Sequence, residues 1–206
     1  MKKLDLRKEL KTLYGQTGGD IAQVSVPAAW FLQIDGEGDP NASPDYAAAV
    51  ETLFTVSYML KFAVKRGPLA LDYAVMPLEG LWWSDDMRTF SADRKADWKW
   101  TMMIRQPECV TPDLVAQARE ASAKKIEPAK LERLRLVRWE EGECLQVLHI
   151  GPFSEEGPAI ERLHASVIAR GGALTGKHHE IYLSDIRRAA PEKWRTILRQ
   201  PFVPAS

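Results

Sequence analysis

The chain has 206 residues, and its 28 Lys and Arg residues balance 28 Asp and Glu residues, so the formal net charge is zero. Hydrophobic residues make up 45% and charged residues 27%, a composition typical of a globular protein whose core needs no disulfide or metal. Proteins that bind nucleic acid usually carry a basic excess, because phosphate contacts supply most of their affinity. The composition therefore argues against direct binding of nucleic acid.

Targeting and metal-binding signals are missing from the sequence. The cysteines, Cys109 and Cys144, lie in no metal-binding motif, and adjacent histidines such as His178 and His179 point to opposite faces of a strand. The charged N-terminus lacks the apolar core of a signal peptide, and no stretch approaches 18 consecutive apolar residues. We expect a cytoplasmic protein with free thiols, no metal, no cofactor and no membrane contact.

The first half of the chain predicts a strand, a helix and two strands. Ala29 to Asp35 is rich in β-forming residues and is followed by Gly36. Ser43 and Pro44 are typical of a helix N-cap and first helical position, and Gly67-Pro68 ends that helix. Two strands are expected after it, at about 70–83 and about 97–105.

The second half predicts the same order. A helix from Thr111 to about Lys125 connects the halves, and a strand at 134–139 turns at Glu141-Gly142 into a strand that ends at Ile150. A helix led by Ser154 follows and stops at Gly171-Gly172. The closing strands are expected at 180–183 and 195–199.

An internal repeat supports this division. The segment 99–107 resembles 193–201 at an offset of 94 residues, and 32–34 resembles 145–147 at an offset of 113. A third pair aligns 79–85 with 180–185, so that Glu79 matches Glu180. The sequence therefore predicts an α+β fold made of duplicated βαββ units in one domain, 1–206. Repeat 1 spans about 25–108, the connecting helix about 111–125 and repeat 2 about 134–206.

The run 178–188, followed by 191–194 and 198–201, closely resembles the C-terminal motif of GyrI-like small-molecule-binding proteins, and 77–83 resembles the same motif. The resemblance implies two βαββ units with pseudo-twofold symmetry around a central ligand cleft. Some members are effector domains of transcription regulators, others stand alone, and one subgroup hydrolyses cyclopropanoid alkylating agents. Only about 25 residues precede the first strand, too few for a helix-turn-helix domain, so a DNA-binding regulator is disfavoured.

Strand alternation nominates the residues of the cleft. His178, Glu180 and Tyr182 share one face of their strand. The repeat then predicts Glu79 on the other side of the same cleft, with Trp82 or Trp83 beside it, depending on a bulge. Further candidate ligand contacts are Trp98, Trp100, Tyr46 and Phe153, the last two at the cleft mouth. Each tryptophan is equally compatible with a place in the core.

These residue types suit one kind of chemistry. Aromatic rings stack on planar ligands, and a carboxylate among them favours a cationic ligand. Desolvation makes a carboxylate a better general base for water, and a tyrosine hydroxyl can donate to an oxygen that gains charge. The resemblance motivates the specific hypothesis that Glu180, with Glu79 and Tyr182, helps water open an activated cyclopropane.

Three functions are compatible with these residues, and we rank them from the most to the least favoured. The first is hydrolysis of cyclopropanoid or similar electrophilic xenobiotics. The second is non-catalytic binding of amphipathic or cationic aromatic compounds. The third is a sensor or gyrase-inhibitor-like role through a protein partner, which no residue pattern specifically indicates.

Overall fold

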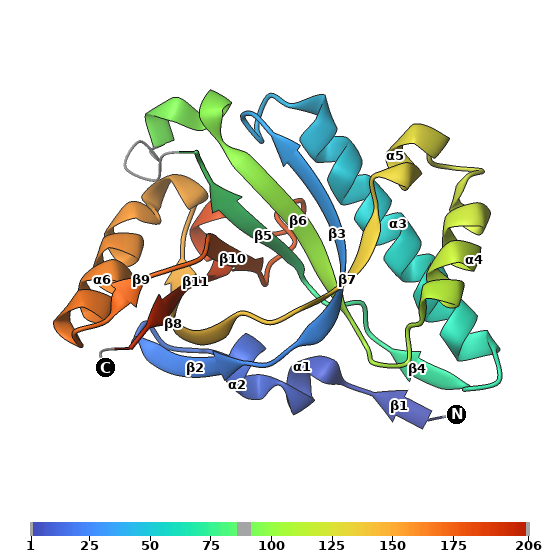
Figure 1. The fold of residues 1–206 in the computed structure, drawn as a ribbon, viewed down its shortest axis with the longest axis horizontal. Helices are drawn as coiled ribbons and strands as arrows, with labels where there is room; N and C mark the ends of the chain where they lie inside the picture. Colours follow the sequence, from blue (N-terminus) through green and yellow to red (C-terminus); the bar gives the residue numbers. More distant parts are fainter. Residues whose placement is uncertain (1, 86–91, 205–206) are drawn as a thin grey trace.

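The structure is a computed structural model that describes residues 2–85 and 92–204. Its centre is a nine-stranded sheet in the order β2-β8-β11-β10-β5-β6-β3-β7, with β9 paired to the end of β11 (Figure 1). All of its neighbouring strands are antiparallel. The two halves of the chain meet where β10 pairs with β5.

The first half contains the predicted elements and, before them, one sheet strand that was not predicted, Ala22–Val26. Its sheet strands are β2 (Ala22–Val26), β3 (Ala29–Glu37), β5 (Leu78–Trp83) and β6 (Lys99–Gln106). The long helix α3 (Pro44–Arg66) begins as predicted, because the Ser43 side chain accepts a hydrogen bond from the Tyr46 N–H and Pro44 occupies the first turn. A short segment, β1 (Lys2–Leu4), α1 (Leu6–Glu9) and α2 (Lys11–Tyr14), precedes them.

The second half repeats the pattern after the connecting helices. These are α4 (Pro112–Ser122), capped by Thr111, and α5 (Pro128–Glu132). The elements that follow are β7 (Arg135–Trp139), β8 (Gly142–Ile150), α6 (Gly157–Ala169), β9 (Ala173–Leu174), β10 (His178–Tyr182) and β11 (Arg195–Val203). Short 3-10 helices at Ala92–Asp97, Phe153–Glu155 and Pro191–Lys193 lie before β6, α6 and β11. The duplicated α+β architecture is confirmed.

The two halves exchange their first strands. The strand β2 pairs with β8 of the second half, and β7 pairs with β3 of the first half. Leu32 lies opposite Leu136, and Leu145 lies opposite Gln23. The same offset of 113 residues therefore relates β3 to β8 and β2 to β7. Each half of the sheet therefore includes a strand that the other half of the chain supplies.

Two predicted strands differ from the structure. The single strand expected at about 70–83 is interrupted before Pro77, and its first part forms β4 (Leu71–Tyr73), which pairs in parallel with β1 outside the main sheet. The strand at 134–139 is present as β7, but it lies beside β3 and not beside β8. Local sequence shows where a strand begins, whereas its partner depends on contacts that are distant in the chain.

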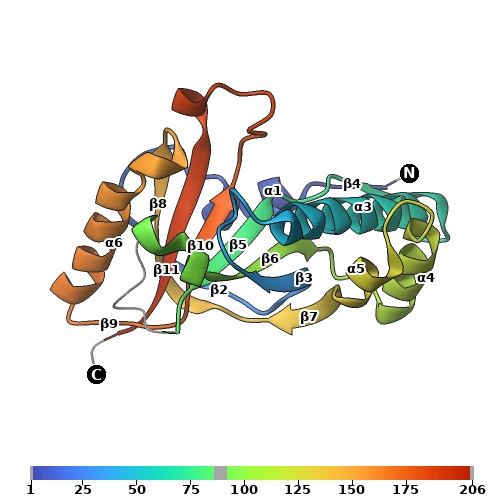
Figure 2. The same ribbon diagram turned by 90° about the horizontal axis from the view of Figure 1, so that it is seen from above.

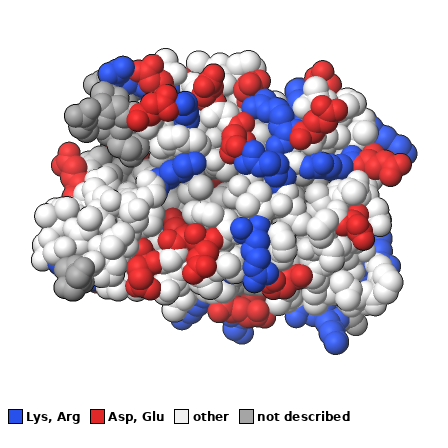
Figure 3. Space-filling view, in the orientation of Figure 1, with Lys and Arg blue, Asp and Glu red and all other residues white. Residues whose placement is uncertain are grey.

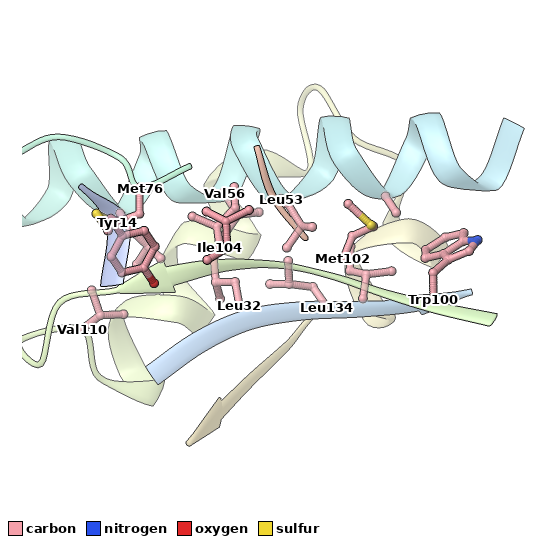
Figure 4. Close-up of a cluster of buried hydrophobic side chains, with 14 of the residues drawn as sticks. Tyr14, Leu32, Leu53, Val56, Met76, Trp100, Met102, Ile104, Val110 and Leu134 are labelled. Atoms are coloured by element: carbon pink, nitrogen blue, oxygen red, sulfur yellow. The ribbon is translucent and has the colours of Figure 1, made fainter. Parts of the chain in front are cut away.

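Helices α3 and α6 cover the same face of the sheet, at its two ends. The register pairs Leu32 with Ile104, and Leu198 with Val147, and residues that pair in this way share a face. Leu53 and Val56 of α3 point at Leu32 and Ile104 (Figure 4). On the other half, α6 packs Leu163 and Val167 over Leu145, Val147 and Leu198. The middle of this face, over β5 and β10, lies between the two helices (Figure 2).

Helix α3 is long and apolar enough, by length and composition alone, to cross a membrane. Its Leu53, Val56 and Leu60 are completely buried against the sheet. A core helix passes the same test of composition, so we interpret α3 as a core helix. On the surface drawn in Figure 3, basic and acidic side chains alternate, and neither sign forms a continuous field.

The packing of Gly36 against Trp100 gives a first prediction. A Cβ at Gly36 would overlap the ring of Trp100, which is completely buried. We therefore expect Gly36→Ala to destabilise the fold by about 1–3 kcal/mol, the usual cost of overpacking, and to lower Tm by roughly 3–10 °C. Gly19→Ala is the matched control, since no atom lies within 4 Å of its added Cβ. Equal Tm values for the two variants in thermal unfolding would contradict this account.

Candidate functional site

The site lies where the two halves pair. On β10 and β5, His178 is opposite Trp82, Glu180 opposite Gly80, and Tyr182 opposite Leu78. All these residues share the face that carries the two helices. Gly80 has no side chain, and the Trp82 indole and the Tyr182 hydroxyl occupy the space above it: a Cβ there would lie 2.8 Å from Trp82 Nε1 and 3.1 Å from Tyr182 Oη. Glycine therefore leaves the space in which Trp82 and Tyr182 meet, beside Glu180.

A chain of hydrogen bonds ends on the Glu180 carboxylate. Trp82 Nε1 donates to Tyr182 Oη at 3.0 Å, and Tyr182 Oη donates to Glu180 Oε2 at 2.6 Å. The other carboxylate oxygen, Oε1, lies 3.3 Å from His178 Nε2. About 13% of the Glu180 side chain is exposed, so water reaches it. Burial, followed by the charge of Glu180, raises the pKa of Tyr182, which stays a neutral donor. Tyr182 thus orients the carboxylate.

Aromatic rings from both halves surround this group. Tyr46, in the first turn of α3, stacks on Trp82 at 6.0 Å and meets Trp100 edge-on at 5.4 Å. Trp98 lies edge-on to Trp82 at 5.6 Å. On the other side, Phe153 contacts Tyr182 at 5.5 Å and Trp194 at 4.9 Å. Trp100 itself is completely buried and supports Tyr46 from within the core.

A second glutamate belongs to this site. Glu156, just before α6, is only 3% exposed, and its Oε1 has no hydrogen-bond partner among the described residues. Burial, followed by the charge of Glu180, raises the pKa of Glu156 to about 9. Glu156 is therefore protonated at neutral pH and can donate a hydrogen bond. Two other buried residues on this face have side-chain atoms with no hydrogen bond of good geometry among the described residues, namely His178, despite its nearness to Glu180, and Thr196.

Sequence reasoning missed Glu156 and Trp194. Glu156 lies in the predicted helix start that Ser154 leads, and no local pattern marks its burial. Trp194 had a usable signal, because the offset of 94 residues aligns it with Trp100, a nominated ligand contact.

Two nominated residues lie on the opposite face of the sheet. Glu79 is opposite Ile181 and completely buried, where it accepts a hydrogen bond from Tyr14 and contacts His179. Trp83 shares this opposite face, with the Lys177 ammonium 3.2 Å from its ring centre. The prediction that Glu79 faces Glu180 across one cleft is therefore wrong, and of the tryptophan pair only Trp82 reaches the site.

The cause of this error is an alignment shift of one residue. The sequence match placed Glu79 against Glu180, but the register pairs Leu78 with Ile104 and Glu180 with Leu198. Because the offset of 94 residues relates Ile104 to Leu198, the structural counterpart of Glu180 is Leu78. A shift of one residue exchanges the two faces of a strand.

A hollow of about 530 Å³ adjoins the aromatic cluster at Trp98. It is lined by Glu37, Ser84, Asp85, Arg94, Ala96, Asp97, Trp98 and Lys99. Glu180 and Tyr182 do not line it, so we place the chemistry at Glu180 and treat the hollow as its neighbour. Within residues 2–85 and 92–204, no group of three or more His, Cys, Asp or Glu residues is arranged to hold a metal ion.

Aromatic rings and carboxylates at the junction of two pseudo-symmetric βαββ units define a small-molecule-binding domain. The sequence agrees: the model for the GyrI-like small molecule binding domain matches residues 20–201, and the chain belongs to this family. No curated protein matches the chain.

Solved structures from Listeria innocua are similar over nearly the whole chain. An uncharacterized conserved protein is 40% identical with a TM-score of 0.89, and the match covers 97% of this chain and all of that one. A hydrolase is 38% identical with a TM-score of 0.87, and the match covers 98% of this chain and all of the other. The C-terminal domain of EcmrR is 12% identical with a TM-score of 0.56, covering 90% and 98%, which supports the fold alone.

Proposed function

We propose that this protein is a cytoplasmic hydrolase that protects the cell by opening the activated cyclopropane of electrophilic aromatic compounds. The observation that carries the proposal is the pair of glutamates in one aromatic site. Glu180 is held by Tyr182 and reached by water, whereas burial and Glu180 raise the pKa of Glu156 to about 9. Two carboxyl groups in such different environments suit opposite roles, base and acid.

The proposed reaction uses both groups in one step. Glu180 takes a proton from water as the water oxygen bonds to the ring methylene. The cyclopropane carbon–carbon bond breaks, and its electron pair passes through the conjugated dienone to the carbonyl oxygen. Glu156 gives its proton to that oxygen, so the product is a phenol that carries a hydroxymethyl group. Tyr182 keeps Glu180 oriented, which replaces the earlier expectation that Tyr182 is the donor to the substrate oxygen.

The aromatic groups account for the class of ligand. Tyr46 and Trp98 on one side, with the buried Trp82 packed against both, and Phe153 and Trp194 on the other offer rings to a planar substrate. Each well-placed ring pair adds about 0.5–1.5 kcal/mol beyond area burial. The description of a 38% identical relative as a hydrolase supports a catalytic role.

The test is multiple turnover of a spirocyclopropane dienone. With substrate at twentyfold excess in ¹⁸O-labelled water, we expect its complete loss and a phenol that carries ¹⁸O on the new hydroxymethyl carbon. Chromatography with mass spectrometry measures both. Loss of substrate that stops at one equivalent, together with alkylated protein, would contradict hydrolysis.

A non-catalytic binder is the second candidate, because the carboxylate among aromatic rings also suits a cationic aromatic ligand. Its signature in the same experiment is saturable quenching of tryptophan fluorescence without product. No observation favours the third role, through a protein partner.

A further inference from the structure

The face of the sheet opposite Glu180 carries a fully buried network of charged side chains. We call Tyr14, Glu79, Glu141, His179 and Arg199 the rear network. Tyr14 is 1% exposed, and the side chains of the other four are at most 1% exposed. They come from the N-terminal segment, from β5, from the turn before β8, from β10 and from β11. The network therefore joins both halves of the chain.

Its centre is the His179 ring, which lies between two carboxylates. Nε2 is 3.0 Å from Glu79 Oε2, and Nδ1 is 2.9 Å from Glu141 Oε1. Each ring nitrogen therefore faces a carboxylate oxygen that can accept a hydrogen bond, a place that suits the protonated ring, which donates from both nitrogens. Burial alone would lower the pKa of His179, but Glu141 and Glu79 outweigh it and raise that pKa. Trp139 packs edge-on against the ring at 5.9 Å.

Arginine completes the charge balance. Arg199 Nη1 donates to Glu141 Oε2 at 3.3 Å, and Arg199 Nε donates to Gln146 Oε1 at 3.0 Å. Burial alone would raise the pKa of Glu141, but His179 and Arg199 outweigh it and lower that pKa. Two carboxylates thus face two cations, with Arg105 as a further charge near Tyr14. Removing one partner of such a buried set leaves an uncompensated charge, which is costly.

The N-terminal segment is attached through the same network. Tyr14 Oη donates to Glu79 Oε1 at 2.8 Å, and Arg199 Nη2 donates to the Leu13 carbonyl oxygen at 2.8 Å. Gln146 Nε2 donates to the Thr12 carbonyl oxygen at 3.0 Å. Thr12, Leu13 and Tyr14 precede residue 20, where the match to the family model begins. The segment is therefore part of the buried structure behind the site.

The rear network and the site share one short strand. His179 stands between His178 and Glu180 on β10, and consecutive Cα atoms are about 3.8 Å apart. We propose that the His179 ring, held between Glu79 and Glu141, is a positioning residue that fixes β10 and so holds Glu180 and Tyr182 in place for the proposed hydrolysis. The inference rests on the proposed function. Such positioning matters because a displacement of about 1 Å can slow a reaction about 100-fold.

The first test is His179→Gln, which keeps one donor but loses the second donor and the charge. We expect kcat to fall at least about tenfold with KM within about twofold, since Glu180 is misplaced while the aromatic rings still bind substrate. His149→Gln is the control, because the one hydrogen bond of its ring among the described residues is to the Pro152 carbonyl oxygen, outside the rear network. A folded His179→Gln variant with the kcat of the natural protein would overturn the proposal.

A second readout does not need activity. Trp82 donates to Tyr182, so its indole N–H resonance reports on the site, which lies on the opposite face of the sheet from the His179 ring. We expect this resonance, identified by its loss in Trp82→Phe, to shift in His179→Gln and to stay in place in His149→Gln. If the natural protein hydrolyses nothing but the resonance shifts, the proposed function fails while the positioning role stands. An unmoved resonance would refute the positioning role.

A third measurement guards against a variant that does not fold. In the natural protein, ¹⁵N spectra of labelled histidine should show one ring that keeps both nitrogens protonated to a higher pH than free histidine does. Tyr14→Phe removes only the hydroxyl that donates to Glu79, and we expect it to fold with kcat lowered about two- to fivefold. A His179 ring that loses its proton at or below the pH at which free histidine does, or a Tyr14→Phe variant with unchanged kcat and an unmoved Trp82 resonance, would overturn the proposal.

Discussion

Replacing Glu180 by Gln is expected to reduce hydrolysis about 100- to 10,000-fold, the usual contribution of a general base. The amide oxygen can still accept the hydrogen bond from Tyr182, so the side chain stays in place, but it no longer takes a proton from water. Ligand affinity should change little, because the surrounding rings are untouched. Single-turnover rates and quenching of tryptophan fluorescence measure the two effects separately.

The control for this variant is Glu192→Gln, an exposed glutamate in the short helix before β11. It changes the net charge by the same amount and should leave hydrolysis unchanged. If Glu180→Gln keeps the activity of the natural protein, Glu180 is not the base. If both variants lose activity equally, the effect comes from total charge and the assignment also fails.

Much of the fold could be predicted because local signals and the repeat agree. Ser43-Pro44 marked the start of α3, Thr111-Pro112 marked α4, and the repeat gave the order of strands. The exchange of β2 and β7 could not be predicted. It depends on pairing between segments more than 100 residues apart, and nothing local in β7 distinguishes β3 from β8 as its partner.

The candidate site, like the fold, could be predicted only in part. Alternation along one strand placed His178, Glu180 and Tyr182 together, because it depends only on the geometry of that strand. Transferring the pattern to β5 failed, because it required a register that a gapped match of a few residues does not fix. Glu79 is consequently a member of the rear network, and its proposed catalytic role is withdrawn. Glu156 comes near Glu180 only through tertiary packing.

Glu156 predicts how activity depends on pH. Its pKa of about 9 keeps the proton needed for the substrate oxygen at neutral pH. We expect the rate of hydrolysis to fall about tenfold per pH unit above about pH 9, as this proton is lost. Glu156→Gln can still donate a hydrogen bond but cannot transfer a proton, so it should be about 10- to 100-fold slower, without that alkaline fall. A rate profile from pH 6 to pH 10.5 decides this.

The same residue predicts how stability depends on pH. The folded pKa of Glu156 is raised, so between about pH 4.5 and 9 the folded state holds a proton that the unfolded state has lost. Its contribution to stability is therefore greatest below about pH 4.5 and declines as pH rises towards 9. His179, whose pKa is also raised, loses its contribution with rising pH too, but it is present in both the natural protein and Glu156→Gln. The difference in Tm between the natural protein and Glu156→Gln therefore measures the contribution of Glu156 alone.

That difference should grow steadily in favour of Glu156→Gln from pH 5 to pH 9, because glutamine has no proton to lose. Glu155→Gln is the matched control, since Glu155 is the adjacent glutamate and is exposed. Its Tm should follow that of the natural protein across the range. A constant difference between Glu156→Gln and the natural protein would mean that Glu156 is ionised in the folded state at neutral pH. The general acid of the proposed reaction would then have to be another group.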